Sequence, residues 1–374
     1  MSPIDLEDGT QIPEIKLSPS ALLDKTTVIY GPSGTGKTVV VKDGLKKLND
    51  YVEQIVLVSP TEPSNRAYEG FVDRAFTHYQ LGTVSKTDKK DTPQKAAHRF
   101  LEAIFQRQEM MAAIYTRANR VEVLSKLYGR LSKGVRRKAD KFIASLERKR
   151  RRVLSSLKRR YAENVGMLGE KVEEANEKFE KMLSLLLKKY LTPHVDALWK
   201  KKGLTEDEFY SLKYIHFNPR LLLLFDDCAA QLKPFFNKEI FRKLFYQNRH
   251  SFITVIICCQ DDTDLPTNLR KNAFISIFTA PIVATSNFER PSNKFPKATK
   301  LYVASILSKI FVGHRKLVYI REDDRKQHFY HLTSPYPKKS MFGSRAIRSL
   351  CDDLRSEGVM MDKNNPYYEK FKVF

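Results

Sequence analysis

The chain has 374 residues, 42 % of them apolar, which allows one large domain or two ordinary ones around a sizeable core. A formal net charge of +23 points to a polyanionic partner, either a nucleic acid or an anionic membrane surface. The acidic first residues and the lack of a long apolar run predict no signal peptide and no membrane-spanning segment. Because the four cysteines show no metal-binding spacing, we expect a reduced, intracellular protein.

The first element is a short strand ending at Tyr30, which is followed by GPSGTGKT at residues 31–38. This is the phosphate-binding pattern G-x4-G-K-[ST], and the apolar spacing after it predicts the helix that such a loop opens. The glycines let backbone N–H groups face phosphate oxygens, Lys37 can reach the β- and γ-phosphates, and the Thr38 hydroxyl can bind Mg²⁺. A chance glycine-rich turn is the alternative, but the strand and the helix are both in place. The predicted nucleotide-binding residues are Gly31, Pro32, Ser33, Gly34, Thr35, Gly36, Lys37 and Thr38.

A second strand at residues 54–60 completes the opening of an α/β domain with a parallel sheet. Residues 94–192 contain no proline and are rich in Lys, Arg, Glu, Leu and Ala, which predicts long helices. In their last part, apolar residues alternate at spacings of four and three, which predicts the seam of a coiled coil or a helical hairpin. The seam residues are Val165, Leu168, Val172, Ala175, Phe179, Met182 and Leu186. We expect no internal repeat.

Positive charge is concentrated in residues 130–160, which hold 14 Lys and Arg residues against only Asp140 and Glu147. The net charge of this segment is +12, over half of the charge of the chain. A solvated helical face is one interpretation, although an exposed helix ordinarily alternates the signs of its charges. We favour contact with DNA, whose counterions a basic segment releases, while RNA or an acidic capsid protein would satisfy the same charge.

Residues 214–335 return to α/β patterning, and the last two strand-like runs, 315–323 and 326–334, predict a hairpin. The run LLLLFDD at 221–227 predicts a strand that is buried on both faces and ends in two acids. Asp226 can hold Mg²⁺ through water, and Asp227 can polarise the attacking water. The alternative for Asp227 is that it caps the turn that follows.

Gln260 ends the apolar run TVIICCQ, 34 residues after Asp226. If the two strands are neighbours, this amide lies beside the γ-phosphate, where it can orient water. Three arginines are candidates for an arginine finger: Arg242, Arg249 and Arg270. Arg249 is preferred because it precedes the strand of Gln260. The predicted catalytic residues are therefore Asp227, Gln260 and Arg249, and the predicted metal-binding residues are Thr38 and Asp226.

Four segments occur together in this order: GPSGTGKT, VSPTEPSN, LLLLFDDC and RHSFITVIICCQ. The set resembles the genome-packaging ATPases of nucleocytoplasmic large DNA viruses, a branch of the FtsK/HerA superfamily of DNA-pumping motors. The resemblance covers residues 20–85 and 214–335 and leaves out the basic helical segment. Most proteins of this general design have Glu at the place of Asp227, so the shorter acid departs from the pattern.

The resemblance implies a RecA-like α/β core, hydrolysis of ATP with Mg²⁺, a ring-shaped homo-oligomer and translocation of double-stranded DNA into a preformed capsid. It implies that Lys37 and Thr38 are the Walker A residues, and that Asp226 and Asp227 are the Walker B acids. By the same match, Gln260 is the polar sensor and Arg249 the arginine. The implied partners are DNA and the capsid or portal-vertex proteins, and the implied location is the viral assembly site in the host cytoplasm or the virion.

The expected organisation is a first part of the ATPase core at residues 1–93, a basic helical insertion at 94–213, a second part of the core at 214–335 and a C-terminal tail at 336–374. Two other functions stay open. A nucleotide kinase fits the phosphate-binding loop but not the basic segment. A non-catalytic DNA-binding scaffold with a nucleotide pocket fits the charge, but the intact Lys37, Thr38 and Asp226 argue against it.

Overall fold

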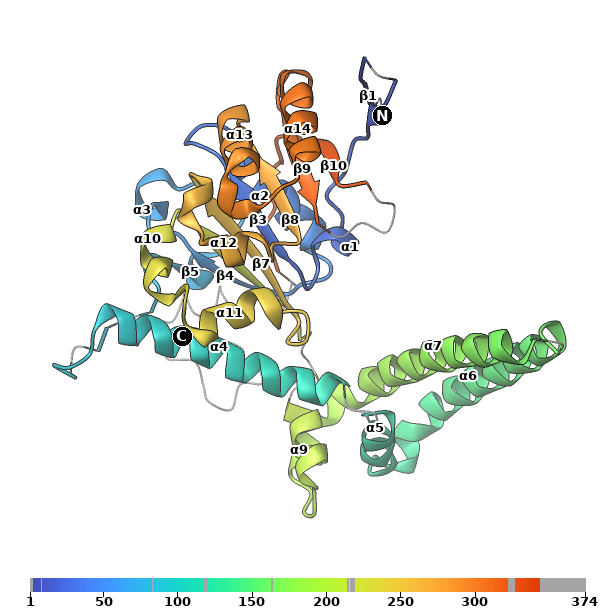
Figure 1. Ribbon diagram of the computed structural model, residues 1–374. Helices are drawn as coiled ribbons and strands as arrows, with labels where there is room; N and C mark the ends of the chain where they lie inside the picture. Colours follow the sequence, from blue (N-terminus) through green and yellow to red (C-terminus); the bar gives the residue numbers. More distant parts are fainter. Residues whose placement is uncertain are drawn as a thin grey trace. The chain divides into compact units, whose positions relative to one another are not determined.

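The computed structural model describes residues 3–343 apart from Asp8, Thr83, Lys86, 117–119, Glu163, Tyr214, 216–218 and 322–326 (Figure 1). The chain divides into two compact units. The first consists of Met1–Glu109 and Asn218–Phe374, and the second is Met110–Phe217. The second unit is thus inserted into the sequence of the first.

The first break between the units lies inside helix α4 (Pro93–Thr116), later than the expected start of the insertion at residue 94. The reason is that the first half of α4 contributes buried apolar side chains to the core of the first unit. These residues are Ala97, Phe100, Leu101, Ile104 and Phe105. At the other end, Phe342 of the expected C-terminal tail is buried in the first unit, and residues 344–374 lie outside the described residues.

The first unit is built on an eight-stranded sheet. The order across the sheet is β10 (Phe329–Thr333), β9 (Arg315–Ile320), β8 (Ile275–Phe278), β3 (Thr26–Tyr30), β7 (Ile253–Cys259), β6 (Leu221–Asp226), β4 (Gln54–Val58) and β5 (Thr77–His78). The strands from β8 to β5 are parallel, whereas β9 and β10 are antiparallel and form the expected hairpin. One strand, β7, separates the strand before the phosphate-binding loop from the strand of Asp226, which is the arrangement of a RecA-like core.

The central strands are buried at every residue, so the sheet is covered on both faces. Alternate residues of each strand enter two separate apolar cores. One core is shared with α4, α11 (Glu239–Tyr246), α13 (Pro281–Glu289) and α14 (Lys297–Ile310), and the other with α2 (Lys37–Leu48). This explains why the strands read as continuous apolar runs in the sequence.

Short elements make the connections around the sheet. They are the two-stranded sheet of β1 (Ile4–Asp5) and β2 (Gln11–Ile12), the helices α1 (Pro19–Leu22), α3 (Glu62–Asn65), α10 (Ala229–Leu232) and α12 (Thr267–Arg270), and the 3₁₀ turns η1 (Arg74–Phe76), η3 (Lys233–Phe235), η4 (Asp262–Asp264) and η5 (Pro291–Asn293). The cysteines in the described part of the chain, Cys228, Cys258 and Cys259, are unbonded and buried.

The second unit is helical throughout its described residues. Its helices are α5 (Arg120–Gly129), α6 (Lys133–Arg160), α7 (Val165–Leu191), α8 (Val195–Trp199) and α9 (Glu206–Lys213), with the 3₁₀ turn η2 (Thr192–His194). The helices α6 and α7 lie side by side (Figure 1), as a helical hairpin requires. The side chain of Asn164 starts α7 by accepting a hydrogen bond of 3.0 Å from the backbone N–H of Met167.

The expected seam of α7 is correct at Ala175 and Phe179 and wrong at Met182. Ala175 and Phe179 are buried, but Met182 is 38 % exposed, and Leu187 is buried instead. A straight helix drifts by about 20° per heptad relative to a strict seven-residue repeat. Steps of four residues from Phe179, to Leu183 and then to Leu187, therefore keep the apolar side chains on the packed face.

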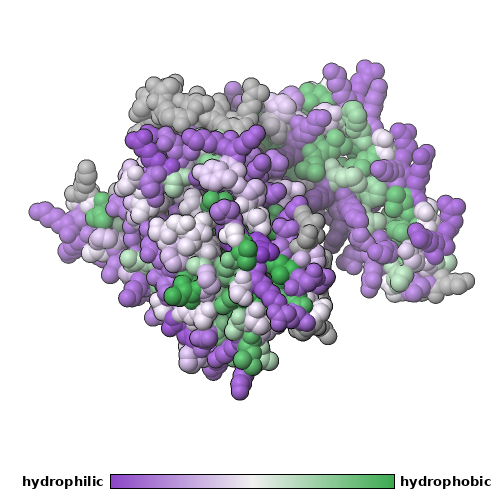
Figure 2. Space-filling view, turned by 90° about the horizontal axis from the view of Figure 1, so that it is seen from above, coloured by the Kyte–Doolittle hydropathy of each residue, from purple (hydrophilic) through white to green (hydrophobic). Residues whose placement is uncertain are grey.

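Hydrophilic residues predominate on the face of the molecule in Figure 2, and apolar residues are interspersed among them. Over the residues that the structure describes, no helix combines the length and the apolar character needed to cross a bilayer.

Candidate nucleotide-binding site

The phosphate-binding loop lies at the edge of the sheet where the parallel strands end, between β3 and α2. The N–H of Gly31 donates to the carbonyl of Cys259 at 3.1 Å, which ties the start of the loop to β7. Gly34 and Gly36 have φ angles of 79° and 92°, which glycine adopts without strain. A Cβ added to Gly31 would overlap the Thr279 hydroxyl. The positive φ angles at Gly34 and Gly36 and the lack of space for a side chain at Gly31 therefore explain why the loop has glycine at these positions.

The Lys37 side chain closes back over this loop. Its ammonium donates to the carbonyl oxygens of Gly31 and Pro32, the second at 3.0 Å. The Thr35 hydroxyl also donates to Pro32 O, at 2.8 Å. An ammonium group has three donors and a flexible stem, so Lys37 can exchange these carbonyls for the oxygens of a bound phosphate.

Asp226 is the last residue of β6 and is only 7 % exposed. Burial raises the pKa of its carboxyl group, and the Tyr68 hydroxyl, the Cys258 thiol and the Lys37 ammonium act in the opposite direction. The Tyr68 hydroxyl donates to Oδ2 of Asp226 at 2.9 Å. Burial and the nearby Asp226 raise the pKa of Tyr68 well above its usual value, so this hydroxyl keeps its proton. The sequence did not identify Tyr68; its only signal was its place in the segment after β4.

Asp227 and Gln260 meet at the ends of neighbouring parallel strands. Asp226 lies opposite Cys258 in the register of β6 and β7, so the residues that follow both strands share one edge of the sheet. The Gln260 amide donates to Oδ1 of Asp227 at 2.7 Å. Asp227 is exposed and has a φ of 53°, a left-handed conformation that turns the chain sharply at the strand end.

A cavity of about 270 Å³ brings most of the predicted site residues together. Its lining residues are Pro32, Ser33, Gly34, Gly36, Lys37, Thr38, Val39, Thr61, Asn65, Asp226, Asp227 and Gln260. The Thr38 hydroxyl and the Asp226 carboxylate are the hard oxygen ligands that Mg²⁺ prefers. A cation would also offset the charge of the buried Asp226, so these residues fit a bound metal–nucleotide complex.

Arg249 lies at the opposite edge of the sheet. It is exposed in the turn between α11 and β7, and β7 runs for seven residues, about 23 Å, before it reaches Gln260. Arg242 is exposed on α11, whereas Arg270 is only 8 % exposed. The Arg270 guanidinium donates to the carbonyls of Asp262 and Leu265 at 2.6 and 2.8 Å, so it is held inside its own chain.

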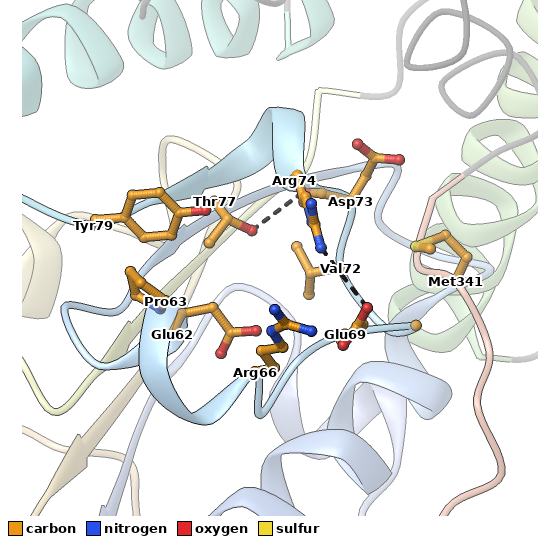
Figure 3. A pocket seen from close by; sticks show the side chains of 11 residues that line it. Glu62, Pro63, Arg66, Glu69, Val72, Asp73, Arg74, Thr77, Tyr79 and Met341 are labelled. Atoms are coloured by element: carbon orange, nitrogen blue, oxygen red, sulfur yellow. Dashed lines mark hydrogen bonds and ion pairs between the residues drawn. The ribbon is translucent and has the colours of Figure 1, made fainter. Parts of the chain in front are cut away.

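A larger cavity of about 530 Å³ lies beside α3. Figure 3 shows the Arg66 side chain between the carboxylates of Glu62 and Glu69, and Arg74 forms an ion pair with Glu69 at 3.8 Å. Burial raises the pKa of Glu62. Three acids and two arginines line this cavity, so it does not concentrate the positive charge that a polyphosphate needs, and the smaller cavity at Lys37 is the candidate site.

Lys316 is a second lysine beside the phosphate-binding loop, and the sequence did not identify it. It lies on β9 and is only 4 % exposed. Its ammonium donates to the carbonyl of His314 at 2.7 Å. A Cβ added to Gly36 would lie 3.6 Å from Lys316 Nζ.

The chain is 49 % identical over 365 residues to the African swine fever virus protein named "Uncharacterized protein B354L", in the isolates Pig/Kenya/KEN-50/1950 and Tick/Malawi/Lil 20-1/1983 among others. The alignment spans 98 % of this chain and 98 % of the relative. No protein-family model matches the chain.

Similar solved structures include the genome-packaging NTPase B204 of Sulfolobus turreted icosahedral virus 2, at 14 % identity and a TM-score of 0.35, covering 84 % of this chain and 99 % of that one. They also include the bacterial conjugative coupling protein TrwB, at 10 % identity and a TM-score of 0.34, covering 92 % of this chain and 91 % of that one.

Proposed function

Since the chain belongs to the family of the African swine fever virus B354L proteins, we propose that it is a viral ATPase that moves double-stranded DNA and packages a genome into a capsid. The observation that carries the ATPase part is the single cavity lined by Lys37, Asp226, Asp227 and Gln260. A phosphate-binding lysine, a buried acid and a second acid held by an amide are the groups that phosphoryl transfer to water requires. The charge of +12 in residues 130–160 supports the DNA part.

In the proposed reaction each residue has a separate task. The amides of the loop and the Lys37 ammonium bind the β- and γ-phosphates of ATP. Mg²⁺, held by Thr38 and Asp226, neutralises charge on the phosphate oxygens. Asp227 orients the attacking water and accepts its proton, and the Gln260 amide holds the Asp227 carboxylate in place.

The position of Arg249 supports a shared active site in a ring of identical subunits. Arg249 lies at the opposite edge of the sheet from the cavity of its own chain, so it cannot contact a nucleotide bound there. Because it is exposed, it can contact the nucleotide of a neighbouring subunit. We place the working protein at the viral assembly site in the host cytoplasm or in the virion, with duplex DNA and capsid or portal-vertex proteins as partners. A core divided by a helical insertion remains part of this proposal, with the insertion expected at 94–213 narrowed to the unit Met110–Phe217.

Turnover of ATP measured with and without duplex DNA tests the proposal against its two alternatives. We expect DNA to stimulate hydrolysis, and Lys37→Ala to abolish it while DNA binding is kept. Phosphorylation of a nucleoside or nucleotide would favour a nucleotide kinase. Binding of DNA without any turnover would favour a non-catalytic scaffold.

A further inference from the structure

The basic helix α6 carries an 11-residue repeat, which corrects the expectation that the chain has none. Residues 135–145 read VRRKADKFIAS, residues 146–156 read LERKRRRVLSS, and residues 157–160 read LKRR. Positions one, eight and nine of the unit are apolar, positions three, four and seven are basic, and positions ten and eleven are Ala or Ser. Eleven residues make just over three full turns, so equivalent positions stay on one face of the helix.

The structure shows which basic residues this repeat turns toward solvent. Apolar positions of the repeat are half-buried on the side of α6 that packs against α7, where Ala139 is fully buried, except that Phe142 is 59 % exposed. Basic residues at positions three and seven lie on the opposite side and are all exposed. We call these residues the basic face: Arg137, Lys141, Arg148, Arg152 and Arg159. The small residues between them, Ala144, Ser145, Ser155 and Ser156, are exposed as well.

The two acids of α6 do not lie on the basic face. Asp140 accepts a hydrogen bond of 2.8 Å from the Tyr128 hydroxyl of α5, and Glu147 lies 3.9 Å from Arg150. Arg150 in turn donates to the side chain of Asn176 on α7 at 3.0 Å. Both acids of α6 are therefore engaged by side chains within the unit, and the charged side chains of the basic face are all positive.

We propose that the basic face is a duplex-binding surface that contacts the phosphate backbone of double-stranded DNA without reading its sequence. Equivalent charges recur every 11 residues, about 16 Å along a helix about 42 Å long, so one helix can contact several phosphates of a duplex. The Ala and Ser residues between the charges let the backbone approach closely. This inference rests on the proposed function and names the part of the chain that holds its substrate.

The test compares two variants that remove the same charge from the same helix. The face variant replaces Arg137, Lys141, Arg148, Arg152 and Arg159 with Gln. The flank variant replaces Arg136, Lys138, Lys149, Lys158 and Arg160 with Gln, which lie on the sides of α6 and are exposed except for the half-buried Arg136. Affinity for a labelled duplex longer than α6 is measured over a series of salt concentrations.

We expect the face variant to lower the slope of log affinity against log salt by about 0.9 for each lost contact, so by about 4.5 if all five side chains contact phosphates. The flank variant should lose less than half as much. Equal losses in the two variants would overturn the proposal, because charge and not direction would then decide binding. Unchanged DNA binding in both variants would also overturn the proposal for the basic face. In that case, stimulation of ATP turnover by duplex DNA in the same variants would show that the proposed function still holds.

A separate observation concerns Lys316. A buried ammonium is costly unless it is paired, and the contact recorded for Lys316 is a neutral carbonyl, that of His314. Burial accordingly lowers the pKa of this lysine. The nearest feature of the fold that binds anions is the loop at Gly36, beside which the ammonium lies.

The geometry points to Lys316 as a second phosphate-binding lysine, which contacts the phosphate chain of the nucleotide from the side of β9. Lys316→Met should weaken binding of ATPγS about 10-fold, the size of one lost charge-assisted hydrogen bond, and Lys316→Arg should restore most of it. Adenosine binding should not change. The matched control is Arg315→Gln, because the Arg315 guanidinium donates to backbone carbonyls at Lys309 and Val312, away from the loop.

A lower melting temperature of Lys316→Met with an unchanged ATPγS affinity would overturn this second proposal, because Lys316 would then only support the fold. Failure of the wild-type protein to bind ATPγS would instead overturn the nucleotide site itself.

Discussion

The side-chain amide of Gln260 donates a 2.7 Å hydrogen bond to Oδ1 of Asp227, although the two residues are 33 positions apart in the chain. Their strands, β6 and β7, are parallel neighbours, so both residues follow a strand at the same edge of the sheet. The bond fixes the direction of one carboxylate oxygen. If loss of the γ-phosphate moves the Gln260 amide, the Asp227 carboxylate loses this hydrogen bond at the same time.

Asp227→Asn should keep the affinity for Mg-ATP and lose turnover. An amide cannot accept the proton of water, and general-base catalysis contributes about 10²–10⁴-fold to rate. The dissociation constant for ATPγS and kcat, measured on the same preparation, separate the two effects. A parallel loss of affinity would mean that Asp227 binds the metal or supports the fold.

Tyr68→Phe should lower the free energy of unfolding by about 1–3 kcal/mol, because it removes the hydrogen bond that the Tyr68 hydroxyl donates to the buried Asp226 carboxylate. Tyr30→Phe is the matched control. Tyr30 is 1 % exposed, and its hydroxyl has no hydrogen-bond partner among the described residues. Urea unfolding at neutral pH should show a loss for Tyr68→Phe and none for Tyr30→Phe; equal effects would remove the special role of the Tyr68 hydroxyl.

His78 should make the protein sensitive to mild acid. Burial lowers the pKa of His78 to about 4, from an ordinary value of 6.5. His78 therefore binds a proton more readily in the unfolded chain than in the folded protein. The contribution of neutral, buried His78 to the free energy of unfolding is complete above pH 6.5 and is lost as the pH falls toward 4. The full difference is about 3 kcal/mol. His78→Leu should unfold with a flatter pH dependence in this window, whereas replacing the half-exposed His98 should not change it.

The phosphate-binding loop, Asp226 and the neighbourhood of Gln260 could be predicted because each depends on residues close in sequence and on the rule that parallel strands end at one edge. Tyr68 and Lys316 could not. Lys316 is the second residue of β9, and it lies beside the loop only because β9 runs antiparallel to β8. The burial of Arg270 likewise depends on Asp262 and Leu265, which η4 brings to its guanidinium.

Arg249→Ala should bind ATP but hydrolyse it very slowly, since an arginine finger contributes about 10³-fold or more to the rate. Lys37→Ala should also be inactive. Mixed rings of the two variants should regain part of the activity, because some interfaces then pair an intact Lys37 with an intact Arg249. Rings that demonstrably mix and stay inactive would show that Arg249 does not act on a neighbour, and the exposed Arg242 would be the next residue to test.

The central claim is that ATP hydrolysis moves the protein along duplex DNA. The most direct measurement is displacement of a third strand from a duplex that carries a short triplex, followed by fluorescence. We predict displacement with ATP, none with ATPγS, and none with Lys37→Ala even though this variant still binds the duplex. Hydrolysis of ATP by the wild-type protein on the same duplex without any displacement of the third strand would contradict the account.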